Sequence, residues 1–163
     1  MRLGAPLVLF PLAFGSSGCS GVGDYIKEPD IQLDHVVVRG IGVSGGTLDL
    51  VMRLDNPNSF SLQGTKLELG IDVEGSHLGD IAYADDYAVP QNGQTTLTLP
   101  LRFGWSGVGS AVRAALGYRD LPYTMKGQAT LRLPGGFTKA FSFTHEGRAP
   151  LTRVAGSVLS PGS

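Results

Sequence analysis

The feature that most constrains the fold of this chain is an alternation of apolar and other residues with a period of two. In residues 47–55, every second residue is a leucine or a methionine, and most of the residues between them are polar. A helix of 3.6 residues per turn would mix these two sets on every face, whereas an extended strand separates them. The pattern therefore predicts a half-buried antiparallel β-strand.

The same period returns along most of the chain and predicts further strands at 31–38, 67–73, 77–84, 96–103, 125–133 and 137–144. Pro100 cannot donate to a ladder, which predicts an edge strand or a bulge there. Pro134, Gly135 and Gly136 are typical of a hairpin connection. About seven strands with polar turns predict an all-β fold, an antiparallel β-sandwich.

One segment has helical spacing instead. Between residues 106 and 117, the apolar side chains recur at intervals of three and four, Ser106 can cap the start, and Gly117 can end the turn. We expect one short helix at about 106–117, connecting two strands at one end of the sandwich.

The amino-terminal segment has the layout of a secretory signal. Arg2 precedes an apolar run at 3–14, and four small residues then lead to Cys19. The run would cover about 18 Å as a helix, less than the roughly 30 Å of a membrane core. We therefore expect a signal peptide of the lipoprotein type at 1–18. After it we expect a tether at 19–30, one domain at 31–147, and a disordered tail at 148–163.

Cys19 is the only cysteine, so it cannot form an internal disulfide. Its place after Ser17 and Gly18 resembles the lipobox of bacterial lipoproteins, although Ser16 stands where that pattern prefers leucine. The resemblance implies lipid attachment at Cys19 and a membrane as partner. Because Ser20 is not aspartate, it implies the outer membrane, facing the periplasm, rather than the inner membrane. The alternative is ordinary cleavage that removes Cys19 or leaves it as a free thiol.

The charge balance and the spacing of titratable residues argue against several classes of function. The chain has 13 basic and 14 acidic residues, which gives no electrostatic footprint for nucleic acid. We expect no cofactor, no metal and no catalytic residues, because the few candidates are scattered or in turns: His35, His77, His145 and the pair Asp85 and Asp86. A metal site or an enzyme would require these five side chains to converge. Nothing in the sequence indicates an oligomeric state.

The aromatic residues allow two interpretations. Trp105 with Phe103 could form a ligand platform, but a large aromatic between a strand and a helix more often covers the core. The tyrosines could likewise line a binding face, yet their spread over separate elements favours ordinary packing: Tyr83, Tyr87, Tyr118 and Tyr123.

Two asparagines flank a proline directly after the strand at 47–55. Pro57 lacks an N–H and stops a ladder, while Asn56 and Asn58 can bond to the backbone groups freed where the strand ends. We interpret this motif as a structural turn, with a ligand site as the alternative. On this basis, Asn56→Ala is expected to cost about 1 kcal/mol of stability, as for one lost hydrogen bond.

Four segments together carry a resemblance to a known family: 48–58 with its Asn-Pro-Asn, 67–73, 94–101 and 123–129. In this order they resemble the late embryogenesis abundant (LEA) type 2 family, also described as the water stress and hypersensitive response (WHy) domain. The resemblance implies a fibronectin- or immunoglobulin-like sandwich with a short helix, no catalytic residues, and an association with desiccation stress. Bacterial members are often secreted or lipid-anchored envelope proteins.

The leading hypothesis is therefore a non-enzymatic, lipid-anchored envelope protein that binds or shields membranes or proteins during water stress. The alternative is a structural or adaptor module that docks onto an envelope complex through a sheet edge or the Trp105 region.

Overall fold

The computed structural model describes residues 26–154. The predicted signal peptide, Cys19 and residues 19–25 of the predicted tether lie outside the described residues, and so do residues 155–163 of the predicted tail. Within the described part, no helix is long and apolar enough to cross a membrane.

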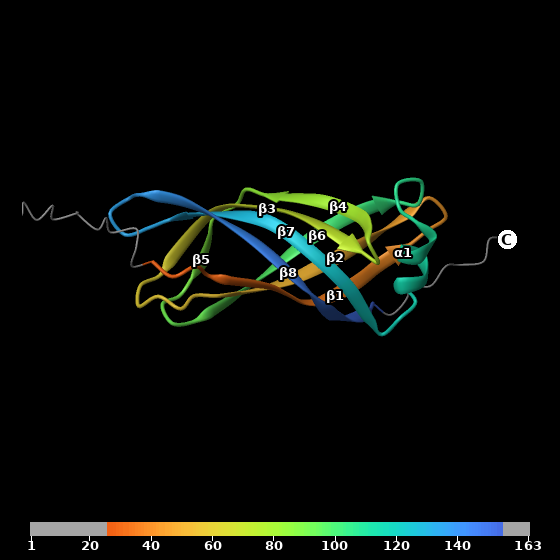
Figure 1. Ribbon diagram of the computed structural model, residues 1–163, viewed down its shortest axis with the longest axis horizontal. Coiled ribbons are helices and arrows are strands. Elements are labelled where there is room, and N and C mark those ends of the chain that lie inside the picture. Colours follow the sequence, from red (N-terminus) through yellow and green to blue (C-terminus); the bar gives the residue numbers. More distant parts are fainter. Residues whose placement is uncertain (1–25, 155–163) are drawn as a thin grey trace, which may run out of the picture.

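Nearly all of the described chain is extended. The elements in order are β1 (Asp30–Ile41), β2 (Gly45–Asp55), β3 (Leu62–Val73), β4 (Ser76–Tyr83), β5 (Tyr87–Val89), β6 (Gln94–Gly104), α1 (Ser110–Ala115), β7 (Asp120–Arg132) and β8 (Thr138–Arg153). Figure 1 shows them as one elongated body, with α1 at one end. The all-β prediction is confirmed, and the predicted strand at 77–84 corresponds to β4.

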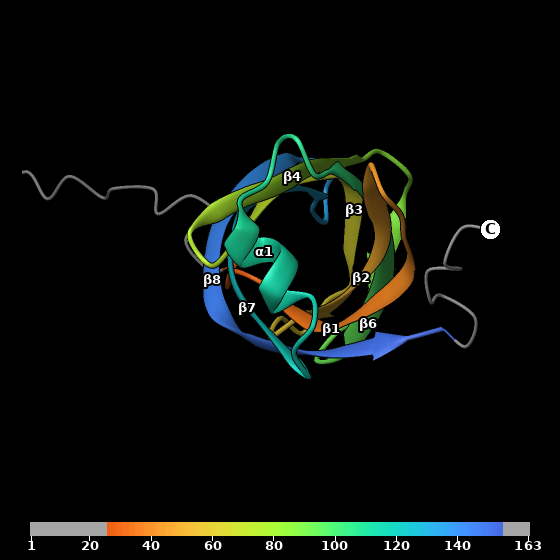
Figure 2. The ribbon, with the colours of Figure 1, turned by 90° about the vertical axis from the view of Figure 1, so that its right-hand side faces the viewer.

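The strands form one sheet rolled almost into a barrel, in the order β4-β3-β7-β8-β1-β2-β6, with β5 paired beside β4 on β3. Viewed from the end that carries α1, the strands run around a common interior (Figure 2). The sandwich prediction is not confirmed. The two halves of the rolled sheet are joined by β8. This strand pairs antiparallel with β7 and then runs parallel to β1 at Val36–Val38. A strand of 16 residues is long enough to belong to both halves.

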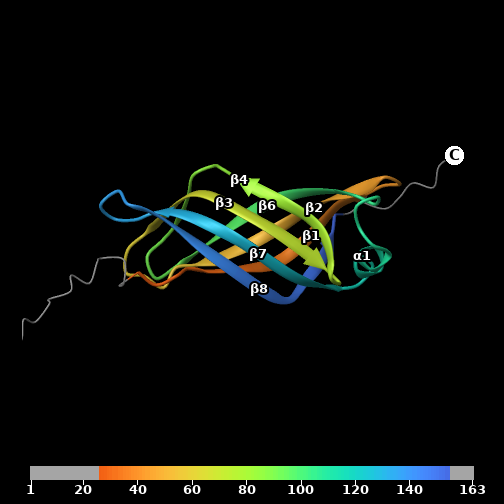
Figure 3. The same cartoon turned by 45° about the horizontal axis from the view of Figure 1, so that its top comes forward.

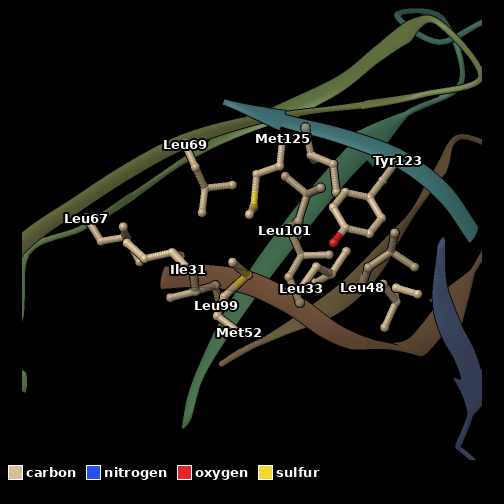
Figure 4. Close-up of a cluster of buried hydrophobic side chains, with 14 of the residues drawn as sticks. Ile31, Leu33, Leu48, Met52, Leu67, Leu69, Leu99, Leu101, Tyr123 and Met125 are labelled. Carbon is tan, nitrogen blue, oxygen red and sulfur yellow. The ribbon is translucent and has the colours of Figure 1, made fainter. Parts of the chain in front are cut away.

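The core is formed by the inward side chains of the alternating strands, as the period of two predicted. Figure 4 shows part of it: Ile31, Leu33, Leu48, Met52, Leu67, Leu69, Leu99, Leu101, Tyr123 and Met125. The alternation fails at Asp49, which is only 8% exposed although it lies on the opposite face from Leu48 and Leu50. Arg39 Nε donates to Asp49 Oδ2 at 2.6 Å and covers the carboxylate.

The helix is shorter than predicted. α1 begins at Ser110, its N-cap is Gly109, and no side chain caps it, so the predicted cap at Ser106 is wrong. Val112 and Ala115 are buried and place the helix across one end of the rolled sheet (Figure 2). The expectation that the helix connects two strands at one end is confirmed, because it joins β6 to β7.

Both proline predictions are confirmed. Pro100 lies in β6, the last strand in the sheet order, where an unpaired edge needs no donor from it. Pro134 opens the β7–β8 hairpin, whose tip lies at the end opposite α1 (Figure 3). Gly135 and Gly136 have φ of 88° and 85°, a conformation that L side chains rarely adopt.

The two ends of the predicted domain need correction. β8 continues to Arg153, so the prediction of a disordered tail is wrong for residues 148–153. Leu151 pairs with Val36 and its N–H donates to the carbonyl of Arg119 at 2.7 Å, contacts between segments far apart in sequence. At the other end, Ile26 already packs against the core. The last residues of the predicted tether therefore belong to the folded unit.

Candidate functional site

The Asn-Pro-Asn motif lies where β2 ends, and Asn56 is its centre. The Asn56 side chain is 3% exposed, and its Nδ2 donates to the carbonyl oxygens of Phe60, Pro90 and Val89 at 2.8, 3.0 and 3.3 Å. Its Oδ1 accepts from the backbone N–H of Asn58 at 3.0 Å and from Asn58 Nδ2 at 2.9 Å. Every polar atom of this amide is thus engaged by the protein itself.

Asn58 binds the amino-terminal end of the domain through its side chain. Its Oδ1 accepts from the Lys27 N–H at 2.9 Å, and its Nδ2 donates to the Lys27 carbonyl at 2.8 Å. The side chain therefore imitates a strand partner for Lys27. The Asn58 carbonyl also accepts from the N–H of Asn92 at 2.9 Å. The motif joins three segments: the entry to β1, the end of β2, and the turn before β6.

A shallow hollow of about 470 Å³ lies beside this turn and is lined by Asp30, Asp55, Asn56, Pro57 and Gln94, among others. Neither asparagine offers it a free amide, because their polar atoms are bonded to the backbone or to each other. The contacts are those of a structural turn, and they give the asparagines no chemical group with which to hold a ligand.

The three histidines and the acidic pair do not converge. His77 lies on the surface between Asp72 and Asp80, with Nδ1 and Nε2 at 2.8 and 3.1 Å from their carboxylate oxygens. Hydrogen bonds to Asp72 and then Asp80 raise the pKa of His77. When the imidazole is protonated, both ring nitrogens donate to these carboxylates, and neither is then free to bind a metal.

The other candidates lie elsewhere. His35 contacts Asp34 at 2.7 Å, and His145 Nδ1 lies 2.8 Å from the hydroxyl of Tyr123. Asp85 and Asp86 are exposed in the turn between β4 and β5. In residues 26–154, no three histidine, cysteine or acidic side chains are placed to hold a metal ion.

The tyrosines are distributed between core and surface. Tyr87 is 7% exposed, and burial raises its pKa to about 12. Its hydroxyl is buried and has no hydrogen-bond partner among the described residues. Tyr123 is 5% exposed and burial raises its pKa as well, whereas Tyr118 is 51% exposed. Ordinary packing therefore describes these side chains better than a common binding face.

Trp105 is the centre of a second cluster at the helical end. Its ring packs edge-on to Phe103, with centroids 4.9 Å apart, and its Nε1 donates to the Gly42 carbonyl at 2.8 Å. Trp105 is partly buried against the core, as the core-packing interpretation predicted. Its outer face carries the guanidinium of Arg113, 4.3 Å from the ring centroid.

Next to this ring is a groove of about 410 Å³, which we call the Trp105 groove: Ile41, Val43, Trp105, Arg113, Leu116 and Arg153 line it. Sequence reasoning identified Trp105 but missed Arg113 and Arg153. The two arginines come from α1 and from the end of β8, and no local pattern indicates that these segments meet.

Comparisons with known proteins agree with this architecture. A family model described as "Late embryogenesis abundant protein" (LEA_2) matches residues 51–147. The solution structure of AT1g01470 from Arabidopsis thaliana is similar with a TM-score of 0.62 at 16% identity, covering 82% of this chain and 88% of that one. The solution structure of At2g46140.1, a putative LEA protein, gives a TM-score of 0.51 at 17% identity, with coverage of 80% and 75%.

At these identities the structural likeness shows the fold alone. A search among curated proteins found no match. The family model, however, spans more than half of the sequence and includes the Asn-Pro-Asn turn together with Trp105 and Arg113. The resemblance noted in the sequence is thereby confirmed, and the chain belongs to the late embryogenesis abundant family defined by the LEA_2 domain.

Proposed function

We propose that this chain is a non-enzymatic, lipid-anchored protein of the cell envelope. Its LEA_2 domain binds and shields membrane surfaces or proteins during water stress. The observation that carries the proposal is the family match over residues 51–147. The leader that ends at the sole cysteine, Cys19, supports the anchored form.

The hydrogen bonds between Asn58 and the Lys27 backbone are consistent with a domain that is anchored through its amino terminus. Cys19 and Lys27 are only eight positions apart, and a fully extended chain over that distance spans about 28 Å. Because Asn58 holds both backbone groups of Lys27, a pull on the tether acts on the turn at the end of β2. The folded unit would stay close to the membrane, with the end that carries α1 directed away from the anchor (Figure 1).

The anchor is tested with a fatty-acid probe on the full-length chain in a host that has an outer membrane. We expect label on the native chain and none on Cys19→Ala, while the neighbouring Ser20→Ala retains it. Membrane fractionation should follow the label. An unlabelled native chain that fractionates with the soluble proteins would contradict the anchor.

The protective role is tested by drying and osmotic shock of a strain that lacks the gene. We expect reduced survival, restored by the native chain and only partly by Cys19→Ala. Leakage from dried phosphatidylglycerol vesicles and aggregation of a dried reporter enzyme should both decrease when the purified protein is added. Recovery of one stoichiometric partner from crosslinked envelopes, without any effect on survival, would favour the adaptor alternative instead.

A further inference from the structure

The Trp105 groove combines positive charge with an apolar surface. The guanidinium carbon of Arg113 lies over the Trp105 ring, 4.3 Å from its centroid. Arg153 donates through Nη2 to the Leu116 carbonyl at the end of α1. Each guanidinium has five N–H donors, so both side chains are positioned and still have donors to offer.

These two arginines have no counter-charge in the described structure. Neither guanidinium lies within 4.0 Å of a carboxylate oxygen belonging to residues 26–154. Arg39 and Arg53 are paired, with Asp49 at 2.6 Å and with Asp55 at 3.1 Å. The other arginines of residues 26–154 form no such pair, but none of them lines the groove: Arg102, Arg119, Arg132 and Arg148. Arg113 and Arg153 differ from these in lining one groove together, where both are available to an anion from outside the described chain.

The rest of the groove is hydrophobic. Ile41 and Leu116 border the core, and Val43 at the tip of the β1–β2 turn is 95% exposed. The volume of about 410 Å³ lies within the range of small-molecule sites, roughly 300–1,000 Å³. A bare inorganic anion would leave this apolar surface unused, and a cation would be repelled by both arginines.

We propose that the Trp105 groove binds a small organic carboxylate with an aliphatic body. The carboxylate lies between Arg113 and Arg153, because a planar guanidinium pairs with both oxygens of a carboxylate. The aliphatic body lies along Ile41 and Val43, beside Trp105, and is removed from water there. This ligand is independent of the anchor and of the protective role proposed above.

Trp105 is the only tryptophan of the chain, so its fluorescence reports on this groove alone. Octanoate is titrated into the full-length protein, with octanol and octyltrimethylammonium as probes of the same chain length and acetate as a probe without the body. We expect a saturable change with octanoate. Octanol, the ammonium compound and acetate should produce none over the same concentrations.

Two variants test whether the arginines bind the carboxylate of octanoate. Arg113→Gln and Arg153→Gln should each weaken octanoate binding by about tenfold or more, as expected for lost hydrogen bonds to a charged group. Arg119→Gln is the matched control, because Arg119 is exposed and close to α1 but does not line the groove. Circular dichroism verifies that all three variants are folded.

Equal binding of octanol and octanoate would overturn the proposal, since the arginines would then contribute nothing. So would equal loss in all three arginine variants, which would indicate a general effect of charge. The absence of any saturable change in the native protein would overturn it directly. Failure in this experiment leaves the survival and labelling results unaffected, so the two proposals are distinguishable.

Discussion

Asn56 makes more bonds than the motif alone suggested. Its side chain donates to three backbone carbonyls and accepts from both nitrogens of Asn58, all in a buried turn. Truncation removes these bonds and leaves several buried groups unpaired, each costing about 1–3 kcal/mol. The expectation of about 1 kcal/mol, based on one hydrogen bond, is therefore too small.

We predict that Asn56→Ala lowers the free energy of unfolding by about 3 kcal/mol, measured by urea denaturation. Ser59→Ala is the control, because Ser59 is exposed and lies three residues away. That variant should change stability by less than about 0.5 kcal/mol. Equal stability of the two variants would mean that the amide network contributes little.

Tyr87 carries a buried hydroxyl without a partner in the described structure, and its pKa is raised to about 12 by burial. The unfolded chain loses this proton near pH 10, before the folded chain does. The contribution of Tyr87 to the free energy of unfolding is therefore fully present below pH 10. It decreases by about 2 kcal/mol as the pH rises from 10 to 12.

We predict that Tyr87→Phe is at least as stable as the native chain at pH 7, because an unpaired polar atom is removed. It should also lose less stability than the native chain between pH 10 and 12. Tyr83→Phe is the comparison, since Tyr83 is only half-buried and its ring lies 6.2 Å from that of Tyr87. The free energy of unfolding of each protein is measured from denaturation curves at pH 7, 10 and 11.5.

The pairing of β3 with β7 depends on a position without a side chain. A Cβ on Gly127 would collide with the carbonyl oxygen of Glu68 on β3 and would lie 2.6 Å from Phe143 Cζ on β8. Backbone cannot move aside without breaking the ladder, so both strands would have to shift. Close approach of three strands therefore explains this glycine better than backbone flexibility does.

We predict that Gly127→Ala costs about 3 kcal/mol of stability. Gly40→Ala on β1 is the matched control, because its Cβ would have no heavy atom within 4 Å. That change should be neutral or stabilising by about 0.5 kcal/mol, through the unfolded state. Thermal melting of both variants provides the test, and a Gly127→Ala variant as stable as Gly40→Ala would contradict the packing described.

The rolled shape of the described chain depends on the last residues of β8. Leu151 pairs with Val36 and packs against the core, and the Val154 N–H donates to the Val38 carbonyl at 3.3 Å. These contacts connect β8 to β1 and so join the two halves of the sheet.

We predict that a chain ending at Pro150 loses about 3 kcal/mol of stability, from lost burial and ladder bonds. A chain ending at Val154 should keep the native value. Hydrogen exchange should show that the loss is concentrated in the amides of β1. If the two truncated chains had the same melting temperature, the pairing of β8 with β1 would not stabilise the fold.

Local patterns determined most of the elements. The period of two placed the inward residues of β2, β3 and β7, because facing in or out in a strand depends only on the parity of the position. The hairpin at Gly135 and the edge at Pro100 were predictable for the same kind of reason, since backbone conformation and a missing donor are properties of the residue itself. The family resemblance also followed from segments in their order along the chain.

Only the tertiary structure decided the closure of the sheet, the hydrogen bonds between Asn58 and Lys27, and the placement of Arg113 and Arg153 in one groove beside Trp105. Each of these joins residues that are 31 or more positions apart. Their distance depends on strand order and register, which alternation within one strand does not specify. For that reason the sequence predicted the strands of this domain, while the rolled sheet and its groove followed only from how those strands pair.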